Sequence, residues 1–425
     1  MPMHLCRRHL RVGFSTLTAS SLLVSLAGCA AVEQAFSYDR APRRTASAAT
    51  MPRPATPGSP VDAARAETPA STPTTLADPI LAERNLAEPT TSPLPSHRST
   101  PTGPWAQRAP ASPNVAQLTF ASVGEVFDPT VSRDGRHMAF AGTQHRTTAD
   151  IYIKRIDSRV VTQLTNDAAE DTMPSISPDG TRIAFASNRS GNWDIFVMPI
   201  SGGRPLQVTS DPSHEVHPSW SPDGTRLIYN RLGLSSGRWE MWVTEVHDSP
   251  VNHFIGYGMF PQWCPLAGTG LTGGDRILFQ RSRERGDRAF SIWTLDFKGD
   301  QASAPTEIIA SPISALINPG WSPDGKRITF ASVPNTGDWA SLSRRRPRKA
   351  ELWMVDIEGT NLIKLTDGAT VDLSPVWANE HRILFASNRN GEDNIWSLDV
   401  SEAIRLASGA PVGDIAGATE TSTER

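Results

Sequence analysis

The chain has 425 residues, 38% of them apolar, and its 44 acidic residues nearly balance 41 lysines and arginines, for a formal net charge of -3. This length suffices for one large or two ordinary domains. Because so balanced a charge creates no overall field that attracts nucleic acid, we expect no nucleic-acid partner. The three cysteines, Cys6, Cys29 and Cys264, lie in different regions without CxxC spacing, so neither a disulfide framework nor a zinc site is expected.

Residues 1–28 have the organisation of a secretory signal peptide. A basic stretch precedes an apolar run, Leu22 to Leu26, that is too short to span a bilayer as a mature helix. The sequence LAGC that ends at Cys29 resembles a bacterial lipobox, which implies that Cys29 is lipidated. Since Ala30 stands where an aspartate would resemble an inner-membrane retention signal, we expect an outer-membrane lipoprotein that faces the periplasm. The alternative is an ordinary cleaved signal with an incidental cysteine.

Residues 29–114 are dominated by Ala, Pro, Thr, Ser and Arg and show no sustained period of 2 or 3.6. Such a segment cannot bury enough apolar surface to offset the entropy lost on ordering. The composition therefore predicts a disordered tether, and residues 411–425 are expected to form a disordered tail.

Residues 115–410 consist of six related units. In each unit a proline is followed by an aromatic residue in an apolar run, and a second aromatic marks the next apolar run. The prolines are Pro129, Pro174, Pro218, Pro261, Pro319 and Pro375; the first aromatics are Phe140, Phe185, Tyr229, Phe279, Phe330 and Phe385; the second are Tyr152, Phe196, Trp242, Trp293, Trp353 and Trp396. Three series of residues that recur together in each of the six units indicate a repeat architecture.

The fullest unit predicts a four-stranded antiparallel blade. Strands are expected over 175–177, 182–187, 194–199 and 206–209, with a PDG turn between the first two. The middle strands are apolar on successive residues, as in a sheet covered on both faces by its neighbours. The predicted fold class is therefore all-β, a six-bladed β-propeller.

Three regions interrupt the regular pattern. The fourth unit lacks the SPDG turn over 264–276, the sixth reads WANEHR over 377–382, and the fifth has an insertion over 333–350. Two terminal segments, Gln117–Phe120 and Ala403–Ala407, each resemble a fourth strand for the last blade. We favour closure by the amino-terminal segment, because a blade that combines strands from both ends of the chain holds the ring closed.

The unit PSISPDGTRIAFASNRSGNWDIFVM resembles the propeller repeat of TolB and its relatives among the WD-like and prolyl-oligopeptidase-type propellers. The resemblance implies a propeller, whereas its implication for function is weaker because propellers host many tasks. TolB has an α/β domain before its propeller, and here only the predicted tether occupies that place. The resemblance implies an envelope protein or peptide as partner, in a Tol-Pal type complex, and we expect a monomer.

Polar residues precede the proline of most units, where the chain enters the innermost strand at one mouth of the central channel. They predict an acidic rim with two histidines that would attract a cation-rich segment of a partner. The alternative is that they are solvated loop residues that cap turns. The predicted partner-binding residues are Glu125, Asp128, Glu170, Asp171, His214, Glu215, His217, Asn318 and Asp372.

An enzyme that acts on oligosaccharide or peptide at the same mouth is the second hypothesis. In it His214 and His217, with Glu170 or Glu215, would bind a metal or transfer protons. Residues three apart on an extended strand point to opposite faces, however, so only a turn would join the histidines. We therefore predict a protein that is not an enzyme, with no catalytic residues, no metal and no cofactor.

The insertion in the fifth unit carries a run of cations. It is either a solvated loop or a contact for phosphate headgroups, lipopolysaccharide or an acidic partner. Its residues are Arg344, Arg345, Arg346, Arg348 and Lys349.

Two segments of the chain match the sequence patterns of known catalytic or nucleotide-binding motifs. GLSSG over 233–237 lies between two predicted strands rather than between a strand and a helix, and GTGLTG over 268–273 precedes a strand. Neither context suits catalysis or dinucleotide binding. Cys264 is expected to be a small packed residue.

Overall fold

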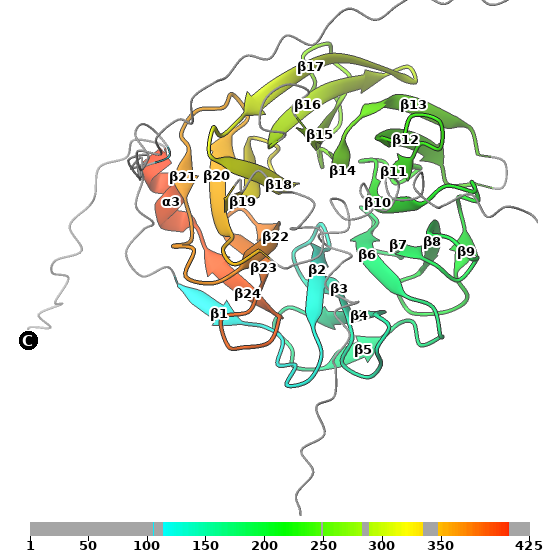
Figure 1. The fold of residues 1–425 in the computed structure, drawn as a ribbon, viewed down its shortest axis with the longest axis horizontal. Helices are drawn as coiled ribbons and strands as arrows, with labels where there is room; N and C mark the ends of the chain where they lie inside the picture. The colour runs from blue at the N-terminus through cyan, green and yellow to red at the C-terminus, as the bar shows by residue number, and fades with distance from the viewer. Residues whose placement is uncertain (1–104, 106–113, 248–249, 283–288, 335–346, 408–425) are drawn as a thin grey trace, which may run out of the picture. The chain divides into compact units, whose positions relative to one another are not determined.

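The computed structural model describes residues 105, 114–247, 250–282, 289–334 and 347–407. They form six four-stranded antiparallel sheets arranged in a ring, which confirms the predicted six-bladed propeller (Figure 1). The predicted signal peptide, Cys29, nearly all of the predicted tether, Arg344 to Arg346 and the predicted tail lie outside the described residues. No helix among the described residues is long and apolar enough to cross a membrane.

Each blade is named by its strands in order from the axis outwards. Blade 1 comprises β2 (Val126–Val131), β3 (His137–Gly142), β4 (Asp150–Arg155) and β5 (Val161–Gln163); blade 2 comprises β6 (Asp171–Ile176), β7 (Arg182–Ser187), β8 (Asp194–Pro199) and β9 (Leu206–Gln207); blade 3 comprises β10 (Glu215–Trp220), β11 (Arg226–Leu232), β12 (Trp239–Glu245) and β13 (Asn252–Tyr257). Blade 4 comprises β14 (Met259–Trp263), β15 (Asp275–Ser282), β16 (Phe290–Lys298) and β17 (Gln301–Ile309); blade 5 comprises β18 (Ser314–Trp321), β19 (Arg327–Pro334), β20 (Glu351–Asp356) and β21 (Ile363–Lys364); blade 6 comprises β22 (Asp372–Asn379), β23 (Arg382–Ser387), β24 (Asn394–Asp399) and β1 (Val115–Gln117).

The innermost strand of every blade contains the proline of the repeat and a β-bulge at that point. In blade 2 the register skips from Thr172 to Ser175, and five equivalent shifts occur in the other blades. The residue before each proline has a positive φ between 49° and 56°. A proline suits the bulge, because it has no N–H group to leave unpaired there. These residues are Asp128, Met173, His217, Phe260, Asn318 and Ser374.

The bulge lies opposite the first aromatic residue of each unit. The side chain of this aromatic residue fills the centre of the blade. In blade 2 the skipped pair lies opposite Phe185, whose side chain is fully buried, and Phe185 is the direct cross-strand partner of Phe196. The same pairing joins the two aromatic series in all six blades. Burial of a phenylalanine contributes about 2–3 kcal/mol, whereas a left-handed residue other than glycine costs roughly 1–2 kcal/mol. The aromatic burial therefore outweighs the strain of the bulge.

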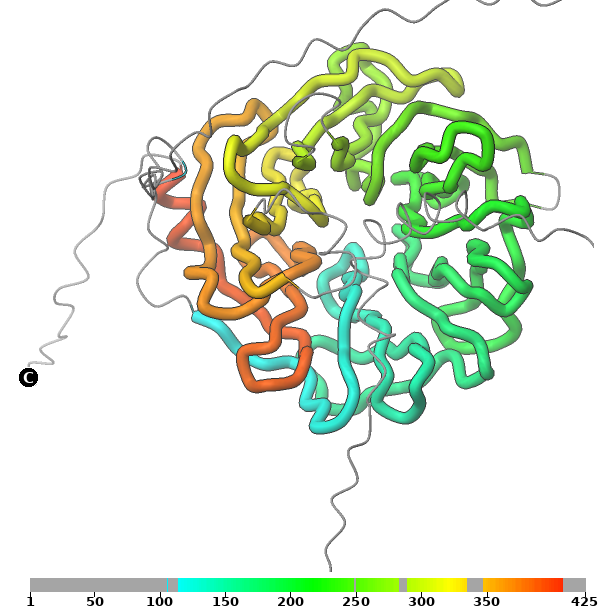
Figure 2. Tube along the Cα trace, viewed as in Figure 1, coloured from blue at the N-terminus to red at the C-terminus, as the bar shows by residue number. Residues whose placement is uncertain are grey.

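The amino-terminal strand closes the ring, as expected from the sequence. β1 pairs with β24, so that Gln117 lies opposite Trp396, and Figure 2 shows the cyan amino-terminal strand beside the orange-red end of the chain. The strand ends before the predicted Gln117–Phe120 segment does, but the N–H group of Leu118 still donates to the carbonyl of Ile395.

The expectation of a strand over Ala403–Ala407 is wrong. This segment lies in helix α3 (Ser401–Ala407), in which Ala403 is buried. Since β1 already occupies the outer edge of blade 6, no ladder is left for a second strand, and the helix instead packs Ala403 into the hydrophobic core that blades 5 and 6 share.

Replacement of Thr119 by valine tests the closure. The buried Thr119 hydroxyl accepts from the N–H group of Ile395 at 2.8 Å and donates to Asn394 at 2.9 Å. Because valine leaves both groups buried without this partner, we expect T119V to lower the free energy of unfolding by about 1–3 kcal/mol. Urea unfolding measures it. The control T162V alters an exposed threonine of β5 and should change stability by less than about 0.5 kcal/mol; equal effects of the two variants would contradict the proposed closure.

Candidate functional site

One face of the ring gathers the loops that enter the innermost strands. Because neighbouring strands are antiparallel, the connection into each innermost strand and the connection between its second and third strands lie on the same face, here named the mouth face. Glu125, Glu170 and His214 lie in its loops. The other six predicted rim residues belong to the innermost strands themselves, so the predicted rim is divided between two environments.

The left-handed residues of the six bulges form a ring of positions on the innermost strands, one in each blade. Some of these side chains reach the next blade. The ring centroids of His217 in blade 3 and Phe260 in blade 4 are 3.8 Å apart. Each blade therefore places one left-handed residue of a different type on the strand nearest the axis.

His217 and Asp128 are the two titratable members of this ring. His217 is 7% exposed, neither of its ring nitrogens has a hydrogen-bond partner in the described structure, and burial lowers its pKa to about 3. Burial also raises the pKa of Asp128 to about 7, although the Met173 N–H group opposes this shift, and Asp128 Oδ2 is unpaired. Both side chains thus have buried polar atoms without a hydrogen-bond partner among the described residues, and such atoms call for an explanation.

Two amides of the second strands, missed in the sequence, satisfy backbone N–H groups that the bulges release. Asn230 Oδ1 in blade 3 accepts from the N–H group of Phe260 in blade 4 at 2.9 Å, and Gln280 Oε1 in blade 4 accepts from Asn318 in blade 5 at 2.8 Å. Each amide follows the first aromatic of its unit, where the other four units have alanine. The replacement of alanine by an amide residue at this position is the sequence signal that would have identified Asn230 and Gln280.

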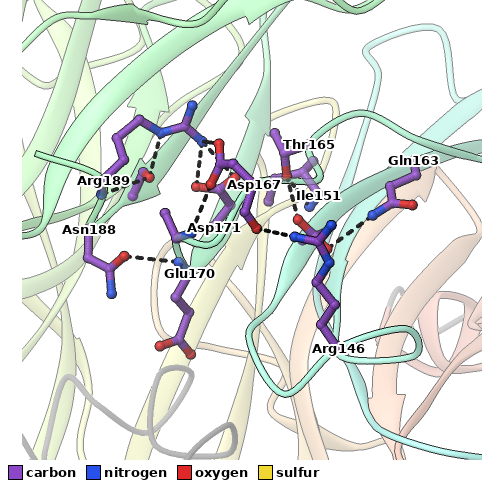
Figure 3. Close-up of polar contacts among 12 residues, drawn as sticks. Arg146, Ile151, Gln163, Thr165, Asp167, Glu170, Asp171, Asn188 and Arg189 are labelled. Atoms are coloured by element: carbon purple, nitrogen blue, oxygen red, sulfur yellow. Dashed lines mark hydrogen bonds and ion pairs between the residues drawn. The ribbon is translucent and has the colours of Figure 1, made fainter.

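Asp171 and Asp372, two of the predicted rim residues, are fully buried and paired with arginine. Arg189 Nη2 lies 2.8 and 2.7 Å from the two carboxylate oxygens of Asp171, as Figure 3 shows. Arg389 contacts Asp372 in the same way, at 3.0 Å to each oxygen. Each guanidinium group also lies over the two paired aromatic rings of its blade. These carboxylates are held inside the structure rather than presented at a rim.

The loop residues of the rim are more accessible. The Glu170 carboxylate points away from the Asp171–Arg189 pair (Figure 3), and burial together with the charge of Asp171 raises its pKa. His214 is exposed, and its Nδ1 accepts from the N–H group of Trp193 at 3.4 Å. Partial burial of the imidazole lowers its pKa.

Exposed apolar side chains accompany the polar residues on the mouth face, and the sequence analysis did not identify them. Phe120, Val123, Leu234 and Ile313 are 64%, 72%, 72% and 48% exposed. They lie in the β1–β2, β11–β12 and β17–β18 connections. A ring of loops that exposes large apolar groups beside carboxylates is typical of a surface that binds a partner.

The two histidines of the enzyme hypothesis lie on different elements, His214 in a loop and His217 in β10. His217 is buried against Phe260, whereas His214 is exposed beside Trp193, so the two rings occupy separate environments. Within the described ranges, no group of three or more His, Cys, Asp or Glu is arranged to hold a metal ion. The 233–237 motif is a turn between β11 and β12 in which the N–H group of Gly237 donates to the carbonyl of Gly233. Cys264 is a buried free thiol.

The described part of the basic insertion contains Arg348 and Lys349, both exposed, whereas Arg344, Arg345 and Arg346 lie outside the described residues. The insertion joins β19 to β20 and therefore emerges on the mouth face. Its proposed contact with an anionic surface stays a prediction.

Comparison with known proteins relates this chain to propellers of the TolB type. Residues 114–255 match the family model described as the TolB beta propeller domain. A stretch of 63 residues is 38% identical to the "Protein TolB homolog" of Chlorobium luteolum and covers 15% of this chain but only 13% of that protein.

Two solved structures are similar to parts of this chain. A protein of Agrobacterium tumefaciens assigned as a TolB has a TM-score of 0.49 and 18% identity, over 67% of this chain and 96% of its own. Oligogalacturonate lyase of Vibrio parahaemolyticus has a TM-score of 0.46 and 15% identity, over 68% of this chain and 94% of its own. Because both identities are below 20%, neither structure informs the activity of this chain.

The buried imidazole of His217 predicts a loss of stability in acid. Its pKa falls from 6.5 to about 3 on folding, so the unfolded chain binds a proton that the folded chain excludes, and the free energy of unfolding falls as the pH drops from 6.5 towards 3. The slope reaches about 1.4 kcal/mol per pH unit. H217N removes this group and keeps a residue that suits the backbone, since Asn318 occupies the equivalent place in blade 5.

Urea unfolding of both proteins between about pH 4 and about pH 7 measures the difference. We expect the acid-side slope of H217N to be shallower, and we expect H214N, which alters the exposed histidine, to reduce the slope less than H217N does. An unchanged slope in H217N would contradict the assignment.

Proposed function

We propose that this chain, which carries a TolB-like six-bladed β-propeller, is a non-enzymatic binding platform of the bacterial cell envelope that holds a protein or peptide segment at its mouth face. The observation that supports this function best is the set of exposed apolar side chains on the mouth-face loops. They surround an axis where Asp128 and His217 have unsatisfied polar atoms.

The chemistry of the mouth face favours an amphipathic partner segment. Phe120, Leu234 and Ile313 would bury apolar side chains, and about 25 cal/mol is gained for each Å² of apolar surface removed from water. Glu170 and Asp128 would accept hydrogen bonds from cationic or N–H groups. A segment of an envelope protein, in a complex of the Tol-Pal type, would supply these groups.

Site-specific photocrosslinking tests the surface in intact envelopes. A photoreactive phenylalanine analogue replaces Phe120, Leu234 or Ile313 on the mouth face, and control variants carry it at Val160 or Leu271, which are equally apolar and exposed but lie in connections on the opposite face. We expect one protein adduct from the three mouth positions and none from the controls. Adducts from neither face, or from both faces alike, would refute the proposal.

The proposed envelope location includes a lipid anchor at Cys29. An acyl chain contributes roughly 0.8 kcal/mol for each methylene group buried in lipid, and stable attachment needs more than one chain, as a bacterial lipoprotein provides. The predicted tether would then separate the propeller from the outer membrane.

Replacement of Cys29 by serine tests the anchor. We expect C29S to lose incorporation of radiolabelled fatty acid and to leave the membrane fraction, whereas C264S, which changes the buried thiol of blade 4, keeps both. Membrane association of C29S equal to that of the unmodified chain would rule the lipid anchor out.

A further inference from the structure

The second aromatic residue of most blades is covered by a cation from its own blade. Blades 2, 3, 4 and 6 each place the guanidinium group of an arginine over this ring, at 3.9 to 5.4 Å from the ring centroid. The arginine follows the first aromatic residue of the same unit by two or four residues. The pairs are Arg189 over Phe196, Arg231 over Trp242, Arg281 over Trp293 and Arg389 over Trp396.

Blade 5 differs at both of these places. Ser332 and Pro334 stand where the other blades have the arginine. Trp353, the second aromatic residue of blade 5, is nevertheless only 2% exposed, whereas Trp242 and Trp396 are half-buried although an arginine covers each of them. Another group must therefore cover Trp353.

Trp105 provides this cover from outside the propeller. Its ring centroid lies 5.2 Å from that of Trp353, and the two ring planes are inclined at 60°. Aromatic pairs are favourable when their centroids are about 4.5–7 Å apart and their planes are not stacked face to face. Because Trp105 precedes β1 and belongs to none of the six sheets, the cover of Trp353 comes from the segment that leads into the propeller.

The contact continues into the hydrophobic core of the seam between blades 4 and 5, where seam means the interface of two neighbouring blades. Trp105 packs against a cluster of buried residues to which both blades contribute. Leu278 and Ile292 come from blade 4, and Leu316 and Phe330 come from blade 5. The indole of Trp105 is itself half-buried, so it is held by apolar packing as well as by the pairing of two rings.

One cation also lies near Trp353, on the outer edge of the blade. The ammonium group of Lys364 is 5.8 Å from the ring centroid and contacts Glu351 at 2.9 Å. Lys364 is the cross-strand neighbour of Trp353 and belongs to β21, which has only two residues. Since so short a strand forms few ladder hydrogen bonds, a loss of packing around Trp353 should affect this edge first.

We propose that Trp105 is an intrachain anchor, which docks the amino-terminal segment on blade 5 by covering Trp353 where other blades use an arginine. β1 holds the same segment on the outer edge of blade 6, so the segment is fixed to two neighbouring blades. Tension applied to the chain ahead of Trp105 would then load the aromatic contact before it reaches the β1–β24 ladder that closes the ring. The inference does not depend on the proposed binding function.

A double-mutant cycle on the full chain measures the contact. W105A and W353L are made singly and together, and urea unfolding gives the equilibrium constant of each protein. We expect the effects of the two changes to be non-additive by roughly 2- to 12-fold in this constant, which corresponds to about 0.5–1.5 kcal/mol for an aromatic pair. The control cycle combines W105A with W242L, which alters the equivalent tryptophan under Arg231 of blade 3, and should be additive. Equal coupling in the two cycles would overturn the proposal.

Intrachain photocrosslinking locates the docked segment without removing the aromatic ring. A photoreactive phenylalanine analogue replaces Trp105, and peptides of the monomeric product are mapped by mass spectrometry after irradiation. We expect adducts with β20 or with the other residues of the cluster in blades 4 and 5. The analogue at Leu271, an exposed residue of the β14–β15 connection, should give no adduct with β20. An adduct from position 105 with a different blade, or one found only between two chains, would refute the intrachain anchor.

Hydrogen exchange shows whether the anchor holds the edge of blade 5. The N–H group of Leu365 donates to the carbonyl of Leu352 at 2.8 Å, and the matched N–H group in blade 2, that of Val208, donates to Ile195 at 2.8 Å. In W105A the protection of Leu365 should fall at least about threefold, because local opening no longer has to break the aromatic contact. The protection of Val208 should not change.

The conservative variant W105F separates the aromatic contact from a general effect of altering the segment. Because phenylalanine can still pair with Trp353, W105F should keep most of the protection of Leu365 that W105A loses. Protection of Leu365 that is the same in W105A as in the unmodified chain would contradict the proposal, as would equal losses in W105A and W105F.

Discussion

The bulge opposite an aromatic residue is the feature on which the rest of this propeller depends. In each innermost strand two residues face one aromatic of the second strand, which in turn pairs with an aromatic of the third. These residues of the three inner strands fill the middle of the blade, and the same arrangement recurs six times with little change. The left-handed residue that the bulge requires always lies beside the axis. Packing within the blades thus determines which position of the sequence can supply the inner wall.

Because the aromatic pair stabilises the blade, the left-handed position is open to different side chains. Aspartate, methionine, histidine, phenylalanine, asparagine and serine occupy it in the six blades, at nearly the same φ. Only some of these residue types favour a positive φ by themselves. Met173 and Phe260 are therefore held there by the surrounding sheet, and the position can vary with little effect on the fold.

The sequence predicted the repeated features of this structure. It did not predict the features that depend on contacts between side chains that lie far apart in the sequence. Pro174, Phe185 and Phe196 recur at matched places, so the blade and the closure of the ring followed from the pattern. Asp171 and Glu215 stand at the same distance before their prolines and were assigned the same role, yet Asp171 is paired with Arg189, whereas Glu215 Oε2 has no hydrogen-bond partner among the described residues. The difference lies four residues after the aromatic, where arginine or glycine is present, and a comparison of units at that position would have revealed it. The helix of Ala403 was misassigned, because the competing strand that displaces it is far away in the sequence.

The seams show how one repeat can build joints of unequal strength. A buried carboxylate needs a compensating charge or a proton, because the desolvation of an unpaired ion costs several kcal/mol. Arg189 and Arg389 provide a positive charge, and they also lie over the aromatic pair, so these joints are tied to the core of the blade. Blade 3 has Gly233 at this position, so Glu215 has no arginine equivalent to Arg189. The same repeat therefore builds joints that differ in the charge they bury, while the aromatic pairs keep each blade intact.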